Sequence, residues 1–394
     1  MNGTIYMPVG EVCSSISDTY REKKNMVTLI NTSDVLEGRV LNHERVPNSN
    51  LKGQFKKTFQ RDDILYSEIR PQNRRFAYVD FSPIDYIAST KLMVIRAKKD
   101  VVSPKYLYYF LKNSSTVAEL QLLAETRSGT FPQITFSEVA NLTIPVPSLA
   151  VQEVIVQTMQ CLEDKITCNE QINDNLEQQA QAIYHERFET VSPNDLPSDW
   201  RIVTLGEVAT ISNKSFNPLK EPEILLEHYS IPAFDEARFP AFELSTSIKS
   251  NKFIIDASCF MISKLNPTTK RVWKPYCLTG NAVCSTEFIV YKAKDQSITD
   301  FLYSVIDSGS FSDFMCSHVT GSTGSRQRTT PSDTLSYELI LPSEDELAEF
   351  QSLVSPMYAQ MRINAIENDK LKRLRDSLLP KLMSGEIDVS AVQL

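Results

Sequence analysis

Apolar residues follow a helical spacing from Val151 to about Phe188. Their positions alternate between steps of four and three residues, which is the a/d pattern of a coiled-coil seam. A helix of about 38 residues, at ~1.5 Å per residue, is roughly 57 Å long, so it cannot lie within a small domain and is predicted to act as a spacer. The seam positions are Ile155, Met159, Leu162, Ile166, Asn169, Asn173, Leu176, Ala180 and Ile183.

The same pattern returns 195 positions later without a gap. The two polar seam positions, Asn169 and Asn173, recur as Asn364 and Asn368. A buried asparagine destabilises a seam but specifies its register, because only another polar group satisfies the amide. The two helices are therefore predicted to pair with each other as an antiparallel coiled coil. The alternative is two unrelated amphipathic helices with asparagines by chance, which the shared offset disfavours. The second seam comprises Phe350, Val354, Met357, Met361, Asn364, Asn368, Leu371, Arg375 and Leu378.

Pro356 interrupts the second seam. Proline in a helix interior removes a hydrogen bond and kinks the helix, at a cost of ~3 kcal/mol. Alternatively, the second helix begins at this point, with Ser355 as its N-cap and proline at the first helical position. That start would exclude Phe350 and Val354 from the seam, and the sequence leaves both interpretations open.

The segment before the first long helix mixes strands and helix. Ser103 and Pro104 are typical of an N-cap followed by proline at the first helical position, and they predict a helix that continues through Val117 to Leu123 or Ala124. Stretches rich in β-branched and aromatic residues predict strands. These strands are Met26–Ile30, Asp63–Ile69, Tyr86–Ile95 and Leu142–Val146.

Short motifs of this segment recur about 196 positions later, after the linker 191–200. The motif at Val9–Val12 recurs at Leu205–Val208, the motif at 69–75 recurs at 265–271, and the motif at 89–94 recurs at 285–290. The sequence therefore predicts an α/β (α+β) protein with pseudo-two-fold symmetry, built by tandem duplication of a globular domain followed by a long helix. The predicted boundaries are 1–147, 148–190, 191–342 and 343–394. Residues between the shared motifs differ, which favours two different recognition surfaces, although drift without function would look similar.

Composition places the chain in an ordinary globular class. It is 42% hydrophobic and 23% charged over 394 residues, without an apolar run of membrane length or an N-terminal secretion signal. Seven cysteines without a CxxC pair favour free thiols in a reducing cytoplasm. The net charge of −8 argues weakly against nucleic acid as a ligand, so local basic clusters must decide.

Several enzyme classes lack their motifs in this sequence. The four histidines are scattered without the spacing of a metal site, and the glycine-rich stretch at 321–325 lacks the Gly-Lys-Ser/Thr of a phosphate-binding loop. The chain also lacks an Asn-Pro-Pro-Tyr-like run that would hold a target adenine. We therefore expect no catalytic residue, no metal and no cofactor on this chain.

Three basic clusters, at 70–75, 266–271 and 320–328, are candidates for DNA contact, because cations bind phosphates and guanidinium or amide groups read base edges. The loop at 70–75 and its repeat at 266–271 form one pair, and the stretches at 127–133 and 320–328 form another. A solvated surface loop is the alternative for each, and recurrence in both halves favours binding for the first pair. A further run, Lys52, Lys56, Lys57 and Arg61, is interpreted as a solvated loop. The candidate residues are Arg70, Asn73, Arg74, Arg75, Thr130, Gln133, Asn266, Thr269, Lys270, Arg271, Arg326, Gln327 and Arg328.

Several motifs resemble those of the specificity subunits of Type I restriction-modification systems. The resemblance covers essentially the full length and is most specific in the two helices and the tail. It rests on Leu196–Trp200 with Leu205–Val208, on Pro145–Pro147 and Leu341–Ser343 before the helices, on Leu162–Ile166, Asn169–Glu177 and Gln181–Phe188, and on the tail Leu378–Ile387.

The resemblance implies a non-catalytic, cytoplasmic subunit that reads a bipartite, asymmetric double-stranded DNA target through two target recognition domains. The paired helices would set the gap between the half-sites and dock two methyltransferase subunits, which carry S-adenosylmethionine. Restriction subunits using ATP and Mg²⁺ would join the restricting complex. The competing hypothesis is a coiled-coil adaptor that holds two protein partners and does not read DNA.

Overall fold

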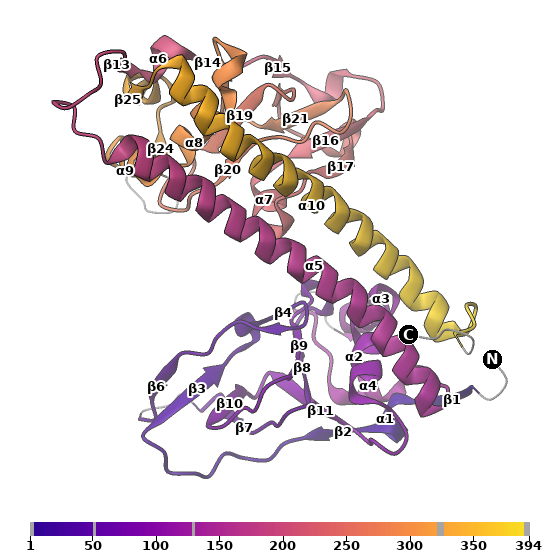
Figure 1. The fold of residues 1–394 in the computed structure, drawn as a ribbon. Coiled ribbons are helices and arrows are strands. Elements are labelled where there is room, and N and C mark those ends of the chain that lie inside the picture. Colours follow the sequence, from indigo (N-terminus) through magenta and orange to yellow (C-terminus); the bar gives the residue numbers. More distant parts are fainter. Residues whose placement is uncertain (1–3, 50–52, 128–130, 321–326, 390–394) are drawn as a thin grey trace. The chain divides into compact units, whose positions relative to one another are not determined.

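The computed structural model describes residues 4–49, 53–127, 131–320 and 327–389. The chain divides into two compact units, unit 1 with residues 1–165 and 371–394 and unit 2 with residues 166–370. Two long helices, α5 (Leu149–Tyr184) and α10 (Glu344–Ser384), each contribute residues to both units (Figure 1). Both helices were predicted from the seam pattern.

Unit 1 contains two four-stranded sheets among its described residues. Its strands are β1 (Ile5–Pro8), β2 (Cys13–Ile16), β3 (Met26–Ile30), β4 (Val35–Leu36), β5 (Arg39–Val40), β6 (Arg45–Pro47), β7 (Phe55–Lys57), β8 (Ile64–Ser67), β9 (Phe76–Tyr78), β10 (Tyr86–Ser89), β11 (Leu92–Ala97) and β12 (Thr143–Val146). One sheet has the order β6–β3–β10–β7, in which β10 is parallel to β3, and the other has the antiparallel order β2–β11–β8–β9. Strand β1 pairs with β12, and β4 with β5.

The core of unit 1 lies between the antiparallel sheet and the helices. The helices are α1 (Val9–Val12), α2 (Pro104–Lys112), α3 (Ser114–Arg127) and α4 (Phe136–Asn141). Tyr66 of β8 and Leu107 of α2 belong to a buried cluster that also contains Met159 of α5 and Leu382 of α10. Apolar burial of this kind contributes about 25 cal/mol per Å², so the ends of the two long helices are held in unit 1 by its core.

Unit 2 repeats this topology. Its strands are β13 (Arg201–Thr204), β14 (Ala209–Ile211), β15 (Ser215–Phe216), β16 (Leu225–Tyr229), β17 (Ala241–Leu244), β18 (Lys252–Ile254), β19 (Cys259–Ser263), β20 (Val272–Trp273), β21 (Ala282–Ser285), β22 (Phe288–Ala293), β23 (Val319–Thr320), β24 (Arg328–Thr329) and β25 (Glu338–Leu341). Its helices are α6 (Leu205–Val208), α7 (Ile231–Ala237), α8 (Thr299–Asp307) and α9 (Gly309–Ser317).

The antiparallel sheets of the two units have the same strand order, and the mixed sheet of unit 2 has one additional edge strand, β15. The antiparallel sheet β14–β22–β19–β20 matches β2–β11–β8–β9, and the pair β13–β25 matches β1–β12. In the mixed sheet β15–β18–β21–β16–β17, the one parallel pair joins β16 and β21, as β3 and β10 are joined in unit 1. The predicted tandem duplication of one domain type is therefore confirmed.

Two predicted elements of unit 1 are interrupted. The range 86–95 was predicted to be one strand, but β10 and β11 belong to different sheets and are separated by Thr90 and Lys91. The Ser89 hydroxyl accepts a hydrogen bond from the Lys91 backbone N–H at 3.2 Å, which turns the chain. The predicted helix to Ala124 is likewise two helices, because Asn113 has a non-helical backbone and its side chain accepts from the Ser115 N–H at 3.2 Å.

Pro356 neither begins the second helix nor ends it. Helix α10 starts at Glu344 and runs continuously past this proline, so a helix start at Pro356 is wrong. Phe350 and Val354 are fully buried, and the Phe350 ring contacts the rings of Tyr184, Phe188 and Phe301. This packing stabilises the turns before Pro356 and offsets the hydrogen bond that proline cannot donate.

Within the part of the chain that the structure describes, no helix is long and apolar enough to cross a membrane.

Candidate nucleic-acid interface

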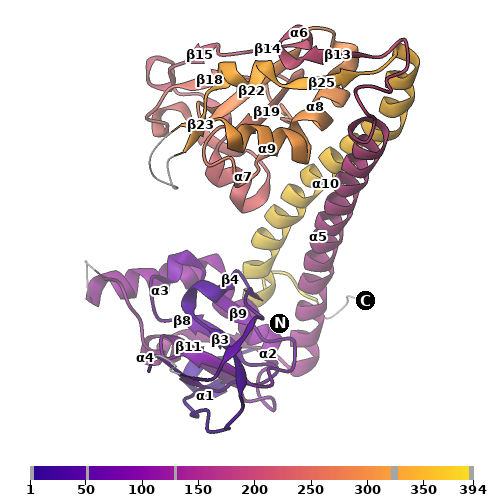
Figure 2. The ribbon, with the colours of Figure 1, turned by 90° about the vertical axis from the view of Figure 1, so that its left-hand side faces the viewer.

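In unit 2, helices α5 and α10 run side by side in opposite directions (Figure 2), and four asparagines form hydrogen bonds between them. Asn169 donates to the Asn368 side-chain oxygen at 2.9 Å, and Asn364 donates to the Asn173 oxygen at 2.8 Å. Asn368 also donates to the carbonyl of Ile166 at 3.3 Å. The two amide contacts are equivalent, because Asn364 is the repeat of Asn169 and Asn368 is the repeat of Asn173. Each contact therefore joins one asparagine of α5 to the repeat of the other. The antiparallel arrangement agrees with the predicted fold, and these asparagines form hydrogen bonds between the two helices.

Replacing Asn169 by leucine is expected to destabilise the protein by about 1–3 kcal/mol, because Asn368 is buried and would lose an amide partner. Replacing Asn169 and Asn368 together removes both partners, so the double variant is expected to melt above the single variant. Thermal melts of the three proteins measure this. A single variant that melts with the wild type would contradict the assignment.

The first candidate cluster lies on loops that follow corresponding strands. We call residues 68–75, after β8, recognition loop 1, and residues 264–271, after β19, recognition loop 2. Both begin with the same turn, in which the hydroxyl of Ser67 or Ser263 accepts from the backbone N–H two residues later. Arg70 and Asn266 then occupy the left-handed region, with φ of 44° and 49°. Such a conformation costs about 1–2 kcal/mol for a residue other than glycine, so its presence in both loops indicates a shared constraint.

A second segment is bound to each loop by equivalent backbone hydrogen bonds. Arg70 donates to the carbonyl of Pro132 at 3.1 Å, and Asn266 donates to the carbonyl of Gln327 at 2.9 Å. Isolated bridges join Ile69 to Gln133 and Leu265 to Arg328. The structure therefore brings Gln133 to recognition loop 1, and Gln327 with Arg328 to recognition loop 2. Thr130 and Arg326, which were also predicted here, lie outside the described residues.

A third segment, the turn between two strands, completes each cluster. The Glu68 N–H donates to the Lys91 carbonyl at 3.0 Å, and the Lys264 N–H donates to the Glu287 carbonyl at 2.9 Å. The side-chain charges are reversed between the halves. Lys91 contacts Glu68 at 3.5 Å and the Gln133 side chain at 3.2 Å, whereas Glu287 accepts two hydrogen bonds from Arg328, each 3.0 Å long. One scaffold thus presents different polar groups in the two units.

Several predicted DNA-contacting cations have partners within the protein. Arg271 forms a two-pronged ion pair with Asp235, at 2.6 and 2.8 Å. Arg75 donates to the carbonyls of Ser33 and Val35 at 3.0 and 3.4 Å. In this state these guanidinium groups hold the loops in place rather than present free donors.

Other members of the predicted set are open to solvent. Arg70, Asn73 and Thr269 are exposed, and Gln327 is half-buried. Among the described residues, the side chain of Arg70 has no hydrogen-bond or ion-pair partner, and the same holds for Asn73 and Thr269. The side chains of these residues are the hydrogen-bond donors of each loop that a ligand could reach.

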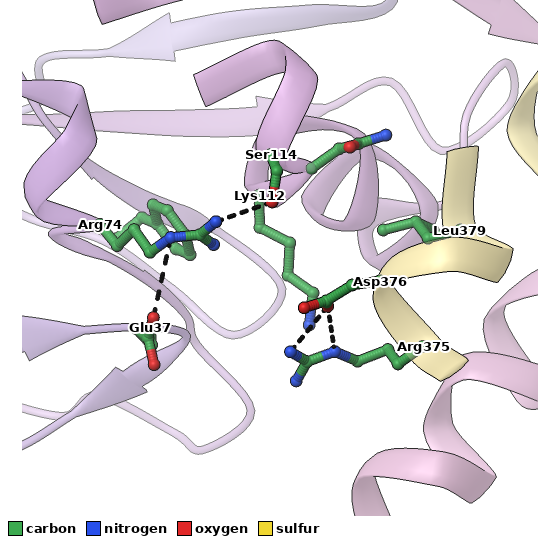
Figure 3. A pocket seen from close by; sticks show the side chains of 9 residues that line it. Glu37, Arg74, Lys112, Ser114, Arg375, Asp376 and Leu379 are labelled. Atoms are coloured by element: carbon green, nitrogen blue, oxygen red, sulfur yellow. Dashed lines mark hydrogen bonds and ion pairs between the residues drawn. The ribbon is translucent and has the colours of Figure 1, made fainter. Parts of the chain in front are cut away.

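Arg74 lines a pocket of unit 1 (Figure 3). It donates to the Ser114 hydroxyl at 2.8 Å and lies 3.8 Å from the Glu37 carboxylate. Lys112 forms an ion pair with Glu163 of α5, which also accepts from the Tyr109 hydroxyl at 2.9 Å. Burial lowers the pKa of Lys112, and Glu163 opposes that shift. The pocket holds cations and carboxylates together, so it does not define an anion site.

The repeat places Lys270 where unit 1 has Arg74, and Asp307 where unit 1 has Lys112. The Lys270 ammonium lies 2.7 Å from the Asp307 carboxylate and donates to the Asp307 backbone carbonyl at 2.6 Å. Burial raises the pKa of Asp307 to about 6, although Lys270 opposes the shift. The structure thus places Lys270, predicted as a DNA contact, in an intramolecular ion pair.

Sequence reasoning missed Asp235, Asp307 and the pair Lys91 and Glu287. The last two were detectable, because they follow Ser-Thr in the repeated motif at 89–94 and 285–290 and differ there in charge. Asp235 and Asp307 lie 36 and 37 positions from their basic partners, and no local pattern marks them.

The fold and the paired loops define a class of protein: two domains of one topology, each followed by a long helix, with corresponding polar loops that differ in side chains. Residues 6–178 match the model of the Type I restriction modification DNA specificity domain. The chain is 29% identical to the Type I restriction enzyme HindI specificity subunit of Haemophilus influenzae, over 92% of this chain and 94% of that protein. It is 25% identical to the MjaIX specificity subunit of Methanocaldococcus jannaschii, over 78% and 76%.

Solved structures agree on the fold. A Type-I restriction-modification system S subunit from M. genitalium superposes with a TM-score of 0.54 at 15% identity, covering 97% of this chain and 96% of the other. A chain from a structure of complex assembly and conformational transition of the type I R-M system gives 0.50 at 19% identity, covering 98% and 99%. The chain is thus similar over most of its length to specificity subunits of Type I restriction enzymes.

Proposed function

We propose that this chain is the DNA-reading specificity subunit of a Type I restriction-modification enzyme, with one half-site of a bipartite target read by each unit. The observation that carries the proposal is the duplicated loop cluster. Its backbone contacts are the same in both units, whereas its exposed side chains differ, Arg70 and Asn73 in one and Thr269 in the other. A shared scaffold with different donors suits recognition of two unlike half-sites.

The partners follow from the family. We propose that the paired helices dock two methyltransferase subunits, which supply S-adenosylmethionine, and that motor-nuclease subunits using ATP and Mg²⁺ join the restricting complex. In this proposal the chain reads DNA and performs no chemistry itself, and it acts in the cytoplasm, where the DNA is. The relatives described as specificity subunits support this assignment.

Within the predicted set, the exposed donors are the better candidates for DNA contact. Arg70 has a planar, forked donor group that matches the O6 and N7 acceptors of guanine, and an asparagine amide matches N6 and N7 of adenine. Arg74, Arg75, Lys270 and Arg271 have protein partners, so alanine variants at these positions would change loop structure as well as charge. They therefore discriminate poorly between DNA reading and a structural role.

Arg70→Ala is expected to weaken binding of the complex with its methyltransferase partner to target DNA. Loss of a base contact should reduce affinity about 5- to 100-fold and relax one base pair of the methylated motif. Loss of a phosphate contact should instead reduce the salt slope by about one unit. Affinity is measured on duplexes at several salt concentrations, and the motif by sequencing methylated DNA. Arg61→Ala, in the run interpreted as a solvated loop, is the matched control.

The adaptor hypothesis makes the opposite prediction. A coiled-coil protein that only holds two partners should bind DNA equally well when Arg70, Asn73 and Thr269 are all alanine. Unchanged affinity and an unchanged methylation motif in this triple variant would contradict DNA reading by these loops.

A further inference from the structure

One side of recognition loop 2 is attached to the interior of unit 2 by a single buried carboxylate. Asp307, the last residue of α8, is 1% exposed. Its carboxylate lies 2.7 Å from the Lys270 ammonium, and Lys270 also donates to the Asp307 carbonyl at 2.6 Å. Neither carboxylate oxygen has a well-aligned hydrogen bond within the described chain. The ion pair with Lys270 is therefore the main compensation for this buried charge.

Helix α8 connects this ion pair to the long helices. Ser304, one turn before Asp307, has its hydroxyl 2.7 Å from the Tyr358 hydroxyl of α10. The Ser304 carbonyl accepts from Gln181 of α5 at 3.3 Å. All these residues belong to unit 2. A rigid α8 thus gives Lys270 a defined point of attachment, and the loop that contains Asn266 and Thr269 is held at that point.

In unit 1, the residues at the corresponding positions do not form this ion pair. The corresponding residues, Arg74 and Lys112, are both cations, and like charges cannot attract. Arg74 instead bonds to Ser114, and Lys112 pairs with Glu163 of α5. The two recognition loops share their backbone contacts but differ in how they are attached to the unit beneath them.

We infer that Asp307 is a positioning residue that holds recognition loop 2 through Lys270, so that DNA reading by unit 2 depends on the charge of this carboxylate while reading by unit 1 does not. The expected effect on DNA reading rests on the proposed function. Its structural part, attachment of the loop, is independent of DNA.

The charge of Asp307 depends on groups from every element packed around it. Lys270 and Arg238 favour the ionised form, and Glu177 of α5 opposes it. Burial opposes it most strongly. Tyr303 and Tyr358 also face this carboxylate, and burial raises the pKa of both, so they are neutral near pH 7. As pH falls below the range where Asp307 is ionised, the ion pair is lost and recognition loop 2 should loosen.

Hydrogen exchange of the full chain tests the attachment without DNA. At pH 8, Asp307→Asn should accelerate exchange of the hydrogen-bonded amides of Asn266 and Thr269 about tenfold relative to wild type at the same pH. At pH 5 the two proteins should exchange alike, because the wild-type carboxylate is then protonated. Peptides from recognition loop 1 should not differ at either pH. Equal exchange at pH 8, or an equal difference at both pH values, would overturn the inference.

Variants of Lys270 distinguish loss of the ion pair that positions recognition loop 2 from a general loss of folding. Lys270→Met should loosen recognition loop 2 as Asp307→Asn does, whereas Lys270→Arg retains the positive charge and should restore wild-type exchange. Failure of Lys270→Arg to restore it would also count against the ion pair. DNA affinity is then measured on duplexes altered in one half-site. If wild type binds no DNA, the proposed function fails, but the exchange results still decide whether Asp307 holds the loop.

Discussion

Inserting one heptad into each long helix, between residues 165 and 166 of α5 and between 370 and 371 of α10, is expected to change the DNA target. Each insertion adds about 10.5 Å of helix and keeps the seam in register, because seven residues are one full repeat. At ~3.4 Å per base pair, the recognised gap should lengthen by about three base pairs. Both insertion points coincide with the boundary between the two units, so contacts within each unit are preserved.

The measurement is the motif methylated by the complex with its methyltransferase partner. We expect loss of modification at the original target and modification at half-sites of unchanged sequence with a longer gap. A heptad in α5 alone is the control, because the two helices would then differ in length at the boundary between the units, and this mismatch should reduce stability instead. An active double insertion with the original gap would show that the helices are not the spacer.

Phe350→Ala is expected to destabilise the protein by about 3–5 kcal/mol, a large loss for a single substitution. Its ring is fully buried and lies 5.1 Å from the Phe188 ring and 6.0 Å from the Phe301 ring, centroid to centroid. Removing it leaves a cavity between α5, α8 and α10. The same cluster stabilises the part of α10 that precedes Pro356, so that part should also lose protection from hydrogen exchange.

Urea or thermal unfolding measures the loss, with Leu353→Ala as the matched control. Leu353 lies on the same helix, three residues away, but is 41% exposed, and its truncation should cost under about 1 kcal/mol. If both variants lose the same free energy of unfolding, the first turns of α10 do not pack as described. A helix that begins near Pro356 would then be the better description.

The helices and the duplication were predictable because they depend on patterns along the chain. Alternating steps of four and three residues specify a helical seam whatever surrounds it. Asn169 and Asn173 recur as Asn364 and Asn368 at one offset, and amides buried in a seam need polar partners. The motif at Val9–Val12 and its repeat form α1 and α6, which share their place in the fold.

Boundaries that depend on contacts between distant segments were not predictable. Tyr86–Ile95 is apolar throughout most of its length, but its two ends join different sheets, and that choice depends on the strands β3 and β8 that pair with them. Pro356 is tolerated inside α10 because Phe350 packs into a cluster with residues of other elements. Helix propensity depends on the local sequence and does not include packing against distant elements.

The sequence alone determined that two copies of one domain, each followed by a long helix, make up this protein, and it identified the loops that carry its exposed donors. Only the tertiary structure decided which cations those loops leave free. Arg271, Arg328 and Lys270 are neutralised by Asp235, Glu287 and Asp307, which lie 36 to 41 positions away in the chain. Electrostatic pairing depends on distance in space, so a basic motif cannot show whether its charge is already compensated.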